Sequence, residues 1–251
     1  MAETALVLLP GLDGSGVMFR PLVAHLPDHI HPIIVSYPSD QMLGYDKLLA
    51  RVLAKVPARE PFVLLGESFS GPIALLAAAR RLPNLVGVIL CATFVRNPVW
   101  LRPRWLQYLV RPLVFRPYRV FAQLKARLYE SKTCDLVSLK AEALRDVCPH
   151  VIAHRVRSVL NVNVTRVLQG CDVPVLYLRG DRDFVVPSHN MKEIARLQPE
   201  VQVAHFSSPH LVLQTQPAEA AEAIGSFIES LHCPVPSVTD LADPQGSSVT
   251  G

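Results

Sequence analysis

Short apolar runs alternate with segments of helical periodicity along this chain, and this alternation constrains its fold more than any other feature. The runs are rich in Val, Ile and Leu and end at turn residues, as strands buried on both faces of a parallel sheet do; they cover residues 4–9, 31–37, 61–65, 86–92, 174–178 and 201–206. The helical segments between them cover residues 18–26, 45–56, 69–82, 191–197 and 218–231. The pattern predicts an α/β fold, with a mainly parallel sheet of about six strands flanked by helices.

One interval breaks the alternation. Roughly 80 residues separate the predicted strand at 86–92 from the one at 174–178, far more than a simple crossover needs. Helical segments at 105–114, 120–129 and 139–147, broken by prolines such as Pro149, predict a small helical cap over the sheet edge. We therefore expect a core of residues 1–96 and 160–233, a cap insertion of residues 97–159, and a disordered tail of residues 234–251.

Composition excludes several classes of protein. Half of the 251 residues are hydrophobic and only 18 % are charged, which excludes a disordered or low-complexity chain. The five cysteines are odd in number and lack metal-site spacing, so we expect a reducing compartment and no metal. Glu3 stands where a signal peptide would carry Lys or Arg. No apolar run reaches the roughly 18 residues that a transmembrane helix needs. A cytoplasmic protein is expected.

A candidate nucleophile follows the predicted strand at 61–65. The strand runs into Gly66-Glu67-Ser68-Phe69-Ser70-Gly71 and then into an Ala/Leu-rich helix. In this context a G-x-S-x-G-like stretch indicates a tight strand-to-helix turn that exposes the serine, with small residues two positions before and after it. Ser68 is the predicted nucleophile, and the alternative is a helix N-cap.

A serine nucleophile needs a base to take its proton and an acid to hold the base. Two aspartates, Asp181 and Asp183, follow the predicted strand at 174–178. His210 follows the predicted strand at 201–206, whereas His205 lies within it. These residues are the candidates for acid and base.

With these motifs in this order, the chain resembles the α/β-hydrolase fold family over nearly its whole length, apart from the predicted cap and tail. Besides the turn at residues 66–71, residues 180–187 are similar to the family's G-x-x-D-x-x-V-P acid loop, and Pro209-His210 matches its base. The resemblance implies that Ser68 is the nucleophile, Asp183 the acid and His210 the general base. Asp181 is then a turn or cap residue, and His205 a half-buried strand residue.

One residue of the turn departs from the family's pattern. Ser70 stands where the turn usually has glycine, and this bears on how tightly the next helix can pack.

The resemblance also implies an oxyanion hole formed by the backbone N–H groups of Leu12 and Phe69. Residues 10–16 are similar to the family's oxyanion loop, with Pro10 where histidine commonly precedes glycine. The alternative, a phosphate-binding loop, is disfavoured because the glycine order is G-x-x-G-x-G, the reverse of the dinucleotide pattern.

The function implied is a cofactor-free serine hydrolase that cleaves carboxylic esters through an acyl-enzyme, of the carboxylesterase or lysophospholipase kind. One alternative is an acyltransferase that uses the same three residues. The other is a non-catalytic ligand-binding member of the fold, which would be expected to have lost the base. The expected partner is a small-molecule ester, with lipid as one candidate.

The predicted cap contains a basic stretch whose net charge of +8 exceeds the +4 of the whole chain. Residues 96–132 hold seven Arg and two Lys against one acid, interleaved with aromatic residues that include both tryptophans. One interpretation is an apolar face that covers the sheet beneath solvated arginines. The other is peripheral contact with an anionic membrane. Nucleic acid is not expected, because no known binding motif accompanies the charge.

Overall fold

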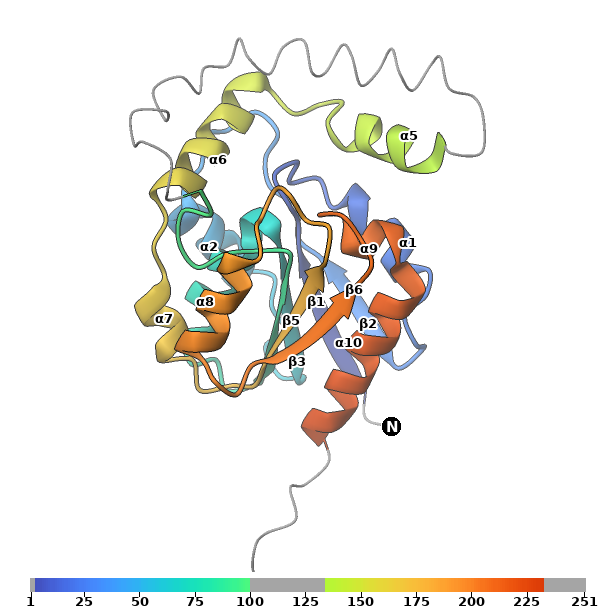
Figure 1. Cartoon of the computed structure of the whole chain (residues 1–251), viewed down its shortest axis with the longest axis vertical. Coiled ribbons are helices and arrows are strands. Elements are labelled where there is room, and N and C mark those ends of the chain that lie inside the picture. The colour runs from blue at the N-terminus through green and yellow to red at the C-terminus, as the bar shows by residue number, and fades with distance from the viewer. Residues whose placement is uncertain (1–2, 100–133, 233–251) are drawn as a thin grey trace, which may run out of the picture.

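The computed structural model describes residues 3–99 and 134–232 of the chain, and its centre is one parallel sheet (Figure 1). The strands are β1 (Thr4–Leu9), β2 (Ile30–Ile34), β3 (Phe62–Glu67), β4 (Leu85–Cys91), β5 (Val175–Gly180) and β6 (Gln202–Phe206). They form a six-stranded sheet in the order β2-β1-β3-β4-β5-β6, and each neighbouring pair is parallel. The predicted fold class is confirmed, and the predicted strands match the observed ones to within a few residues.

The strand order reverses between β1 and β3. The chain passes outward from β1 to β2 and then returns to the other side of β1, where Leu9 is in register with Gly66. In an open α/β sheet, ligands bind outside the carboxyl ends of the strands at such a reversal. The loop after β1 and the turn after β3 therefore meet at one edge.

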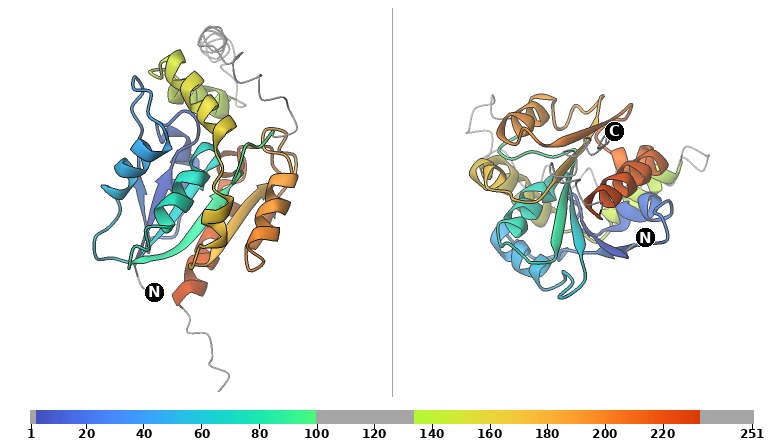
Figure 2. Two further views of the ribbon diagram at one scale, coloured as in Figure 1. Left: turned by 90° about the vertical axis from the view of Figure 1, so that its left-hand side faces the viewer. Right: turned by 90° about the horizontal axis from the view of Figure 1, so that it is seen from below.

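Helices cover both faces of the sheet (Figure 2), because successive side chains of a strand point to opposite faces. One face packs Val7 and its neighbours against α2 (Tyr45–Leu53), α3 (Gly71–Ala78), α7 (Thr165–Gln169) and α8 (His189–Leu197). The other packs Leu8 and its neighbours against the 3₁₀ helix η1 (Val17–Phe19), α1 (Arg20–Val23), α9 (Val212–Thr215) and α10 (Pro217–His232). Both faces of the sheet are thus buried.

Two helices from the predicted cap, α5 (Cys134–Ala143) and α6 (Pro149–Asn161), lie over the carboxyl edge of the sheet (Figure 1). The predicted helix at 139–147 is α5, which begins and ends earlier. Helix α6 was not predicted, because Pro149 was interpreted only as a breaker. That interpretation is wrong: Pro149 occupies the first turn of α6, where its missing N–H needs no intrahelical acceptor.

Several expectations lie outside the described residues: the helices at 105–114 and 120–129, most of the basic stretch, and the tail at 234–251. The expected boundary at residue 160 falls in the last turn of α6. Among the described helices, none is long and apolar enough to cross a membrane.

Candidate active site

Ser68 lies at the tight turn between β3 and α3, in the short 3₁₀ helix η2 (Ser68–Ser70). Its φ of 47° is in the left-handed region, which is strained for a residue with a Cβ. A Cβ on Gly66 would come within 2.7 Å of the Ser70 carbonyl oxygen and 2.8 Å of the Gly71 Cα. The turn therefore requires glycine at position 66, and it exposes the Ser68 hydroxyl at the edge of the sheet.

Ser70, which departs from the family's pattern, is buried with two hydrogen-bond partners for its hydroxyl. The Ser70 hydroxyl is fully buried, bonded to Tyr37 Oη at 2.8 Å and donating to the Pro10 carbonyl. A Cβ on Gly71 would collide with the side chain of Thr93, two residues after β4. The close approach of Thr93 thus requires glycine at position 71.

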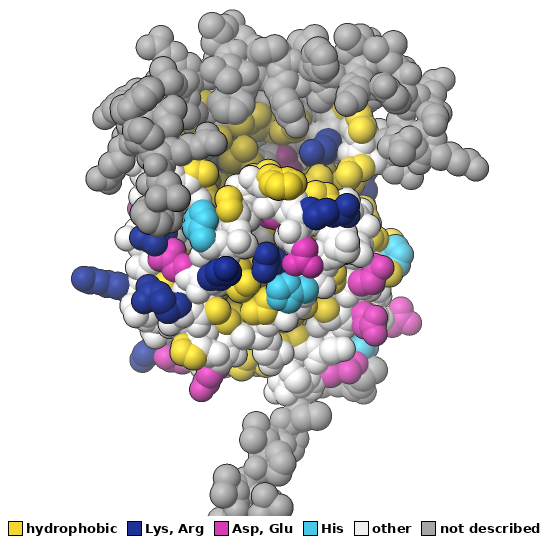
Figure 3. Space-filling view, viewed as in Figure 1, with side chains coloured by type: hydrophobic (Ala, Val, Ile, Leu, Met, Phe, Trp, Pro, Cys, Tyr) yellow, Lys and Arg dark blue, Asp and Glu magenta, His cyan; other side chains and the backbone are white. Residues whose placement is uncertain are grey.

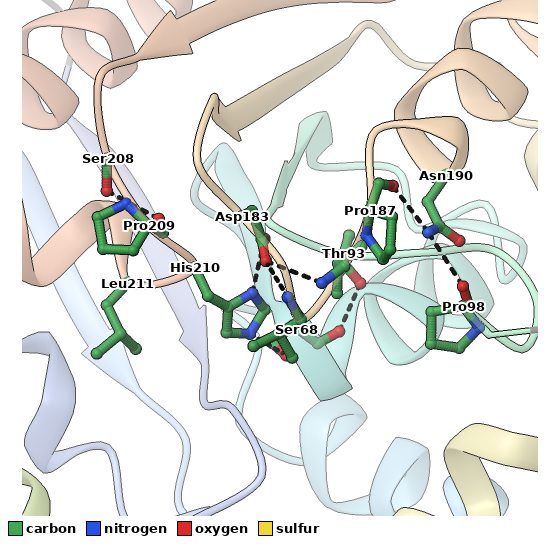
Figure 4. A network of polar contacts seen from close by, with 12 residues as sticks. Ser68, Thr93, Pro98, Asp183, Pro187, Asn190, Ser208, Pro209, His210 and Leu211 are labelled. Carbon is green, nitrogen blue, oxygen red and sulfur yellow. Dashed lines mark hydrogen bonds and ion pairs between the residues drawn. The ribbon is translucent and has the colours of Figure 1, made fainter.

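The structure brings Ser68, His210 and Asp183 together in a line (Figure 4). His210 Nε2 lies 2.9 Å from Ser68 Oγ, and His210 Nδ1 lies 2.7 Å from Asp183 Oδ2. The side chain of Asp183 is only 5 % exposed. An ionised carboxylate only accepts hydrogen bonds, so Nδ1 carries the proton of a neutral imidazole and Nε2 can accept one from Ser68.

The loop after β1 borders the same site. Leu12 and Phe69 line one cavity with Ser68. The loop turns through Gly14, whose φ is 73° and whose N–H donates to the Gly11 carbonyl at 3.1 Å. Phe69 follows Ser68 in the first turn of the helical segment, where N–H groups have no intrahelical acceptor. Both residues predicted to form the oxyanion hole thus line the cavity at Ser68.

Sequence comparison agrees with this geometry. The model of the alpha/beta hydrolase family matches residues 6–223. The chain belongs to the alpha/beta hydrolase family.

Individual relatives of this alpha/beta hydrolase include an enzyme of known activity. A "pimeloyl-[acyl-carrier protein] methyl ester esterase" from Xanthomonas oryzae pv. oryzae is 29 % identical over 245 residues, covering 90 % of this chain and 96 % of the relative.

Solved structures that share this fold are named for different activities. An esterase from Exiguobacterium antarcticum has a TM-score of 0.75 at 17 % identity, covering 91 % of this chain and 92 % of its own. A bromoperoxidase from Bacillus anthracis has a TM-score of 0.73 at 15 % identity, covering 91 % and 92 %. At such identities the likeness shows the fold alone.

Asp181 and His205, the alternative candidates for acid and base, pair with each other instead of with Ser68. Asp181 Oδ1 lies 3.0 Å from His205 Nδ1 and 3.8 Å from Arg179 Nε. The hydrogen bond from His205 holds the pKa of Asp181 below its usual value. Half of the His205 side chain is exposed. The structure therefore brings Asp183 and His210 to Ser68, and it places Asp181 and His205 in a separate surface pair.

A cavity of about 610 Å³ opens at Ser68. Its lining is mostly apolar and includes Ile152, Val156 and Val159 of α6. Hydrophobic side chains also gather on the described surface at the end of the molecule where α5 and α6 lie (Figure 3). Lys140 of α5 lines the same cavity, and burial lowers its pKa. The alpha/beta hydrolase thus offers an apolar pocket with one lysine in its described wall.

Glu67 is an acidic residue of the site that sequence reasoning missed. Its side chain is buried beside the nucleophile, where Oε1 accepts a hydrogen bond from Gln214 Nε2 at 2.8 Å and the carboxyl group also accepts the Gly11 N–H. Burial raises the pKa of Glu67 to about 7. The available signal was a lone acid at the end of an apolar strand.

Metal ligands are not clustered in the described ranges: there, no three His, Cys, Asp or Glu side chains are placed to hold an ion.

Proposed function

We propose that this alpha/beta hydrolase is a serine esterase that cleaves carboxylic esters through an acyl-enzyme on Ser68. The observation that carries the proposal is the hydrogen-bonded line from Asp183 through His210 to Ser68, at the mouth of an apolar cavity. The esterase named among the relatives supports it, since the match covers nearly the whole of both chains.

The acylation step follows from the three side chains. His210 Nε2 takes the proton of Ser68 Oγ as that oxygen attacks the ester carbonyl carbon. The Asp183 carboxylate, 2.7 Å from Nδ1, stabilises the imidazolium that forms. The negative charge that develops on the carbonyl oxygen is stabilised by the N–H groups of Leu12 and Phe69.

The remaining steps return the site to its starting state. The tetrahedral intermediate collapses with cleavage of the carbonyl–alkoxy bond, and His210 donates its proton to the leaving alcohol. Water then attacks the acyl-enzyme with His210 again as base, releasing the carboxylic acid and restoring the Ser68 hydroxyl. The cycle consumes one water and needs no cofactor.

The substrate class follows from the cavity. Its apolar lining fits a hydrocarbon acyl chain, which gains free energy by leaving water. Carboxylesterase and lysophospholipase substrates both meet this requirement. The activity named for the Xanthomonas relative adds methyl esters of carrier-bound acyl chains to the candidates.

Contact with anionic lipid through residues 96–132 is a further proposal. It requires binding to anionic vesicles that added salt weakens. Vesicles that are ignored whatever their charge, together with turnover of short-chain esters alone, would contradict it.

The experiment that tests the proposal is a chain-length series of p-nitrophenyl esters, extended to methyl esters that include pimeloyl-acyl-carrier-protein methyl ester. Wild-type protein is compared with Ser68→Ala, and products are analysed with and without added alcohol. Carboxylic acid release that depends on Ser68 supports an esterase, whereas a new ester in excess of the acid would indicate acyl transfer. Ester binding without turnover would indicate a non-catalytic protein.

A further inference from the structure

Arg155 is a buried arginine on α6, the helix that lies over the carboxyl edge of the sheet. The residue is 2 % exposed. Its guanidinium donates to three backbone carbonyls: Nη1 to Leu12 at 2.9 Å and to Asp13 at 2.7 Å, and Nη2 to Pro38 at 2.9 Å. A side chain from the cap region therefore bonds directly to the loop that follows β1.

A buried charge of this kind is a costly way to attach a helix. Removing an arginine from water carries a large free-energy cost, and well-packed apolar residues often stabilise a fold equally well. Burial lowers the pKa of Arg155, and this effect is opposed by the nearby Asp13 and Tyr37. Two of the three carbonyl bonds hold the loop after β1, and the third joins the same guanidinium to Pro38, which follows β2.

The loop carries the Leu12 N–H, which the proposed mechanism uses. The Gly11 carbonyl before that N–H accepts the N–H of Gly14 at 3.1 Å, and the Leu12 carbonyl after it accepts Arg155. The direction of the N–H is thus held from both sides. The fit is close, because a Cβ on Gly14 would come within 2.5 Å of Arg155 Nη1.

Two other supports of this loop come from the core. The Ser70 hydroxyl donates to the Pro10 carbonyl, and the Glu67 carboxyl group accepts the Gly11 N–H. Arg155 differs from them because it comes from α6, which lies over the sheet edge and lines the acyl cavity from that side through residues such as Ile152. It joins the wall that contacts the substrate to the loop that stabilises the oxyanion.

We propose that Arg155 is a positioning residue, which aims the Leu12 N–H at the developing oxyanion and so couples α6 to the reaction. The inference rests on the proposed esterase function. Arg155 acts through the loop and does not touch the reacting atoms.

The test compares Arg155→Met and Arg155→Lys with wild-type protein. Methionine removes all three bonds, and lysine keeps the charge without the planar fork that reaches carbonyls on two segments. We expect kcat on a p-nitrophenyl ester to fall about 10- to 100-fold in Arg155→Met, with KM little changed, because a misplaced donor loses part of the transition-state stabilisation. The kcat of Arg155→Lys should lie between those of wild type and Arg155→Met.

Arg157→Met is the matched control, because Arg157 lies on the same helix with an exposed side chain. Rates are normalised to active sites titrated with a fluorophosphonate, and thermal melts report folding. If Arg155→Met does not fold, Arg155→Lys and Arg155→Gln carry the same comparison.

Inhibition by a trifluoromethyl ketone separates positioning from a merely structural role. Its tetrahedral adduct with Ser68 places an oxyanion in the hole, so its Ki should rise across the series by the same factor as kcat/KM falls. A variant that lost only thermal stability would keep the wild-type Ki and the wild-type kcat/KM per titrated active site.

The outcomes separate the inference from the function on which it rests. Wild-type protein that turned over no ester would overturn the proposed function and this inference together. An active wild type would overturn the inference alone if Arg155→Met kept its kcat and Ki, lost activity only through KM, or lost no more than Arg157→Met.

Discussion

Asp183 holds the His210 ring from a fixed position, with Oδ2 2.7 Å from Nδ1. Its other oxygen accepts the N–H groups of Val185 and Val186, each at 2.8 Å. The carboxylate is therefore oriented by its own loop before any substrate binds.

Asp183→Asn should reduce kcat by about 10⁴, because an amide in place of the carboxylate favours the wrong tautomer of His210. Asp181→Asn is the matched control, since it changes the same group two residues away and disturbs only the surface contacts with His205 and Arg179. Steady-state kinetics on one p-nitrophenyl ester compare them. Loss in Asp181→Asn with an intact rate in Asp183→Asn would reverse the assignment.

Ser70→Ala should lower the free energy of unfolding by about 1–3 kcal/mol, because it leaves the buried Tyr37 hydroxyl and the Pro10 carbonyl without this partner. Urea denaturation measures the change, with Ser188→Ala, at an exposed position, as the control. Equal stability of the two variants would show that the Ser70 hydroxyl contributes nothing beyond its volume.

Glu67 makes stability depend on pH. Its pKa is about 7 in the folded protein because it is buried, whereas the unfolded value is near 4.3. The folded state thus binds the proton more tightly, and stability is lost as pH rises from the unfolded to the folded pKa. The neighbouring charged groups, Asp13 and His210, act in opposite directions on this pKa.

Glu67→Gln removes this titration while keeping the size of the side chain. The free energy of unfolding of the variant, relative to wild type, should rise by about 3 kcal/mol between about pH 4.5 and pH 7.5. Urea denaturation at several pH values measures this difference. A difference that stayed constant with pH would mean that Glu67 ionises at its ordinary pKa in the folded state.

Lys140 should affect the choice of acyl chain. An ammonium in an apolar cavity favours an acyl chain that carries a negative group and disfavours a neutral one. Lys140→Met should lower kcat/KM for a dicarboxylic acid monoester relative to a neutral ester of equal length. The readout is the ratio of the two kcat/KM values, and an unchanged ratio would show that Lys140 does not face the bound acyl chain.

The fold, and the meeting of Ser68, Asp183 and His210 at one edge of the sheet, could be predicted from sequence because the signals are local. Each strand is a short apolar run bounded by turn residues, and Ser68, Asp183 and His210 each follow a strand within a few residues. Parallel strands bring their carboxyl ends to one edge, so the order of motifs along the chain was enough to expect these residues together.

The supporting contacts could not be predicted, because they join distant segments. Arg155 meets Leu12 across 143 positions, and Gln214 meets Glu67 across 147. From charge patterning alone, Arg155 is expected to be one more solvated arginine. Only the packing of α6 on the loop after β1 shows that it is buried. The role of Gly71 was missed because it depends on Thr93, which lies two residues after β4.

The central claim is that Ser68 carries the acyl group during turnover. Intact-protein and peptide mass spectrometry after rapid quenching with a p-nitrophenyl ester tests it most directly. The account predicts one acyl group, on the peptide that contains Ser68, absent from Ser68→Ala, whose kcat should fall by about 10⁶. An acyl group on another residue, or ester turnover that survives in Ser68→Ala, would contradict it.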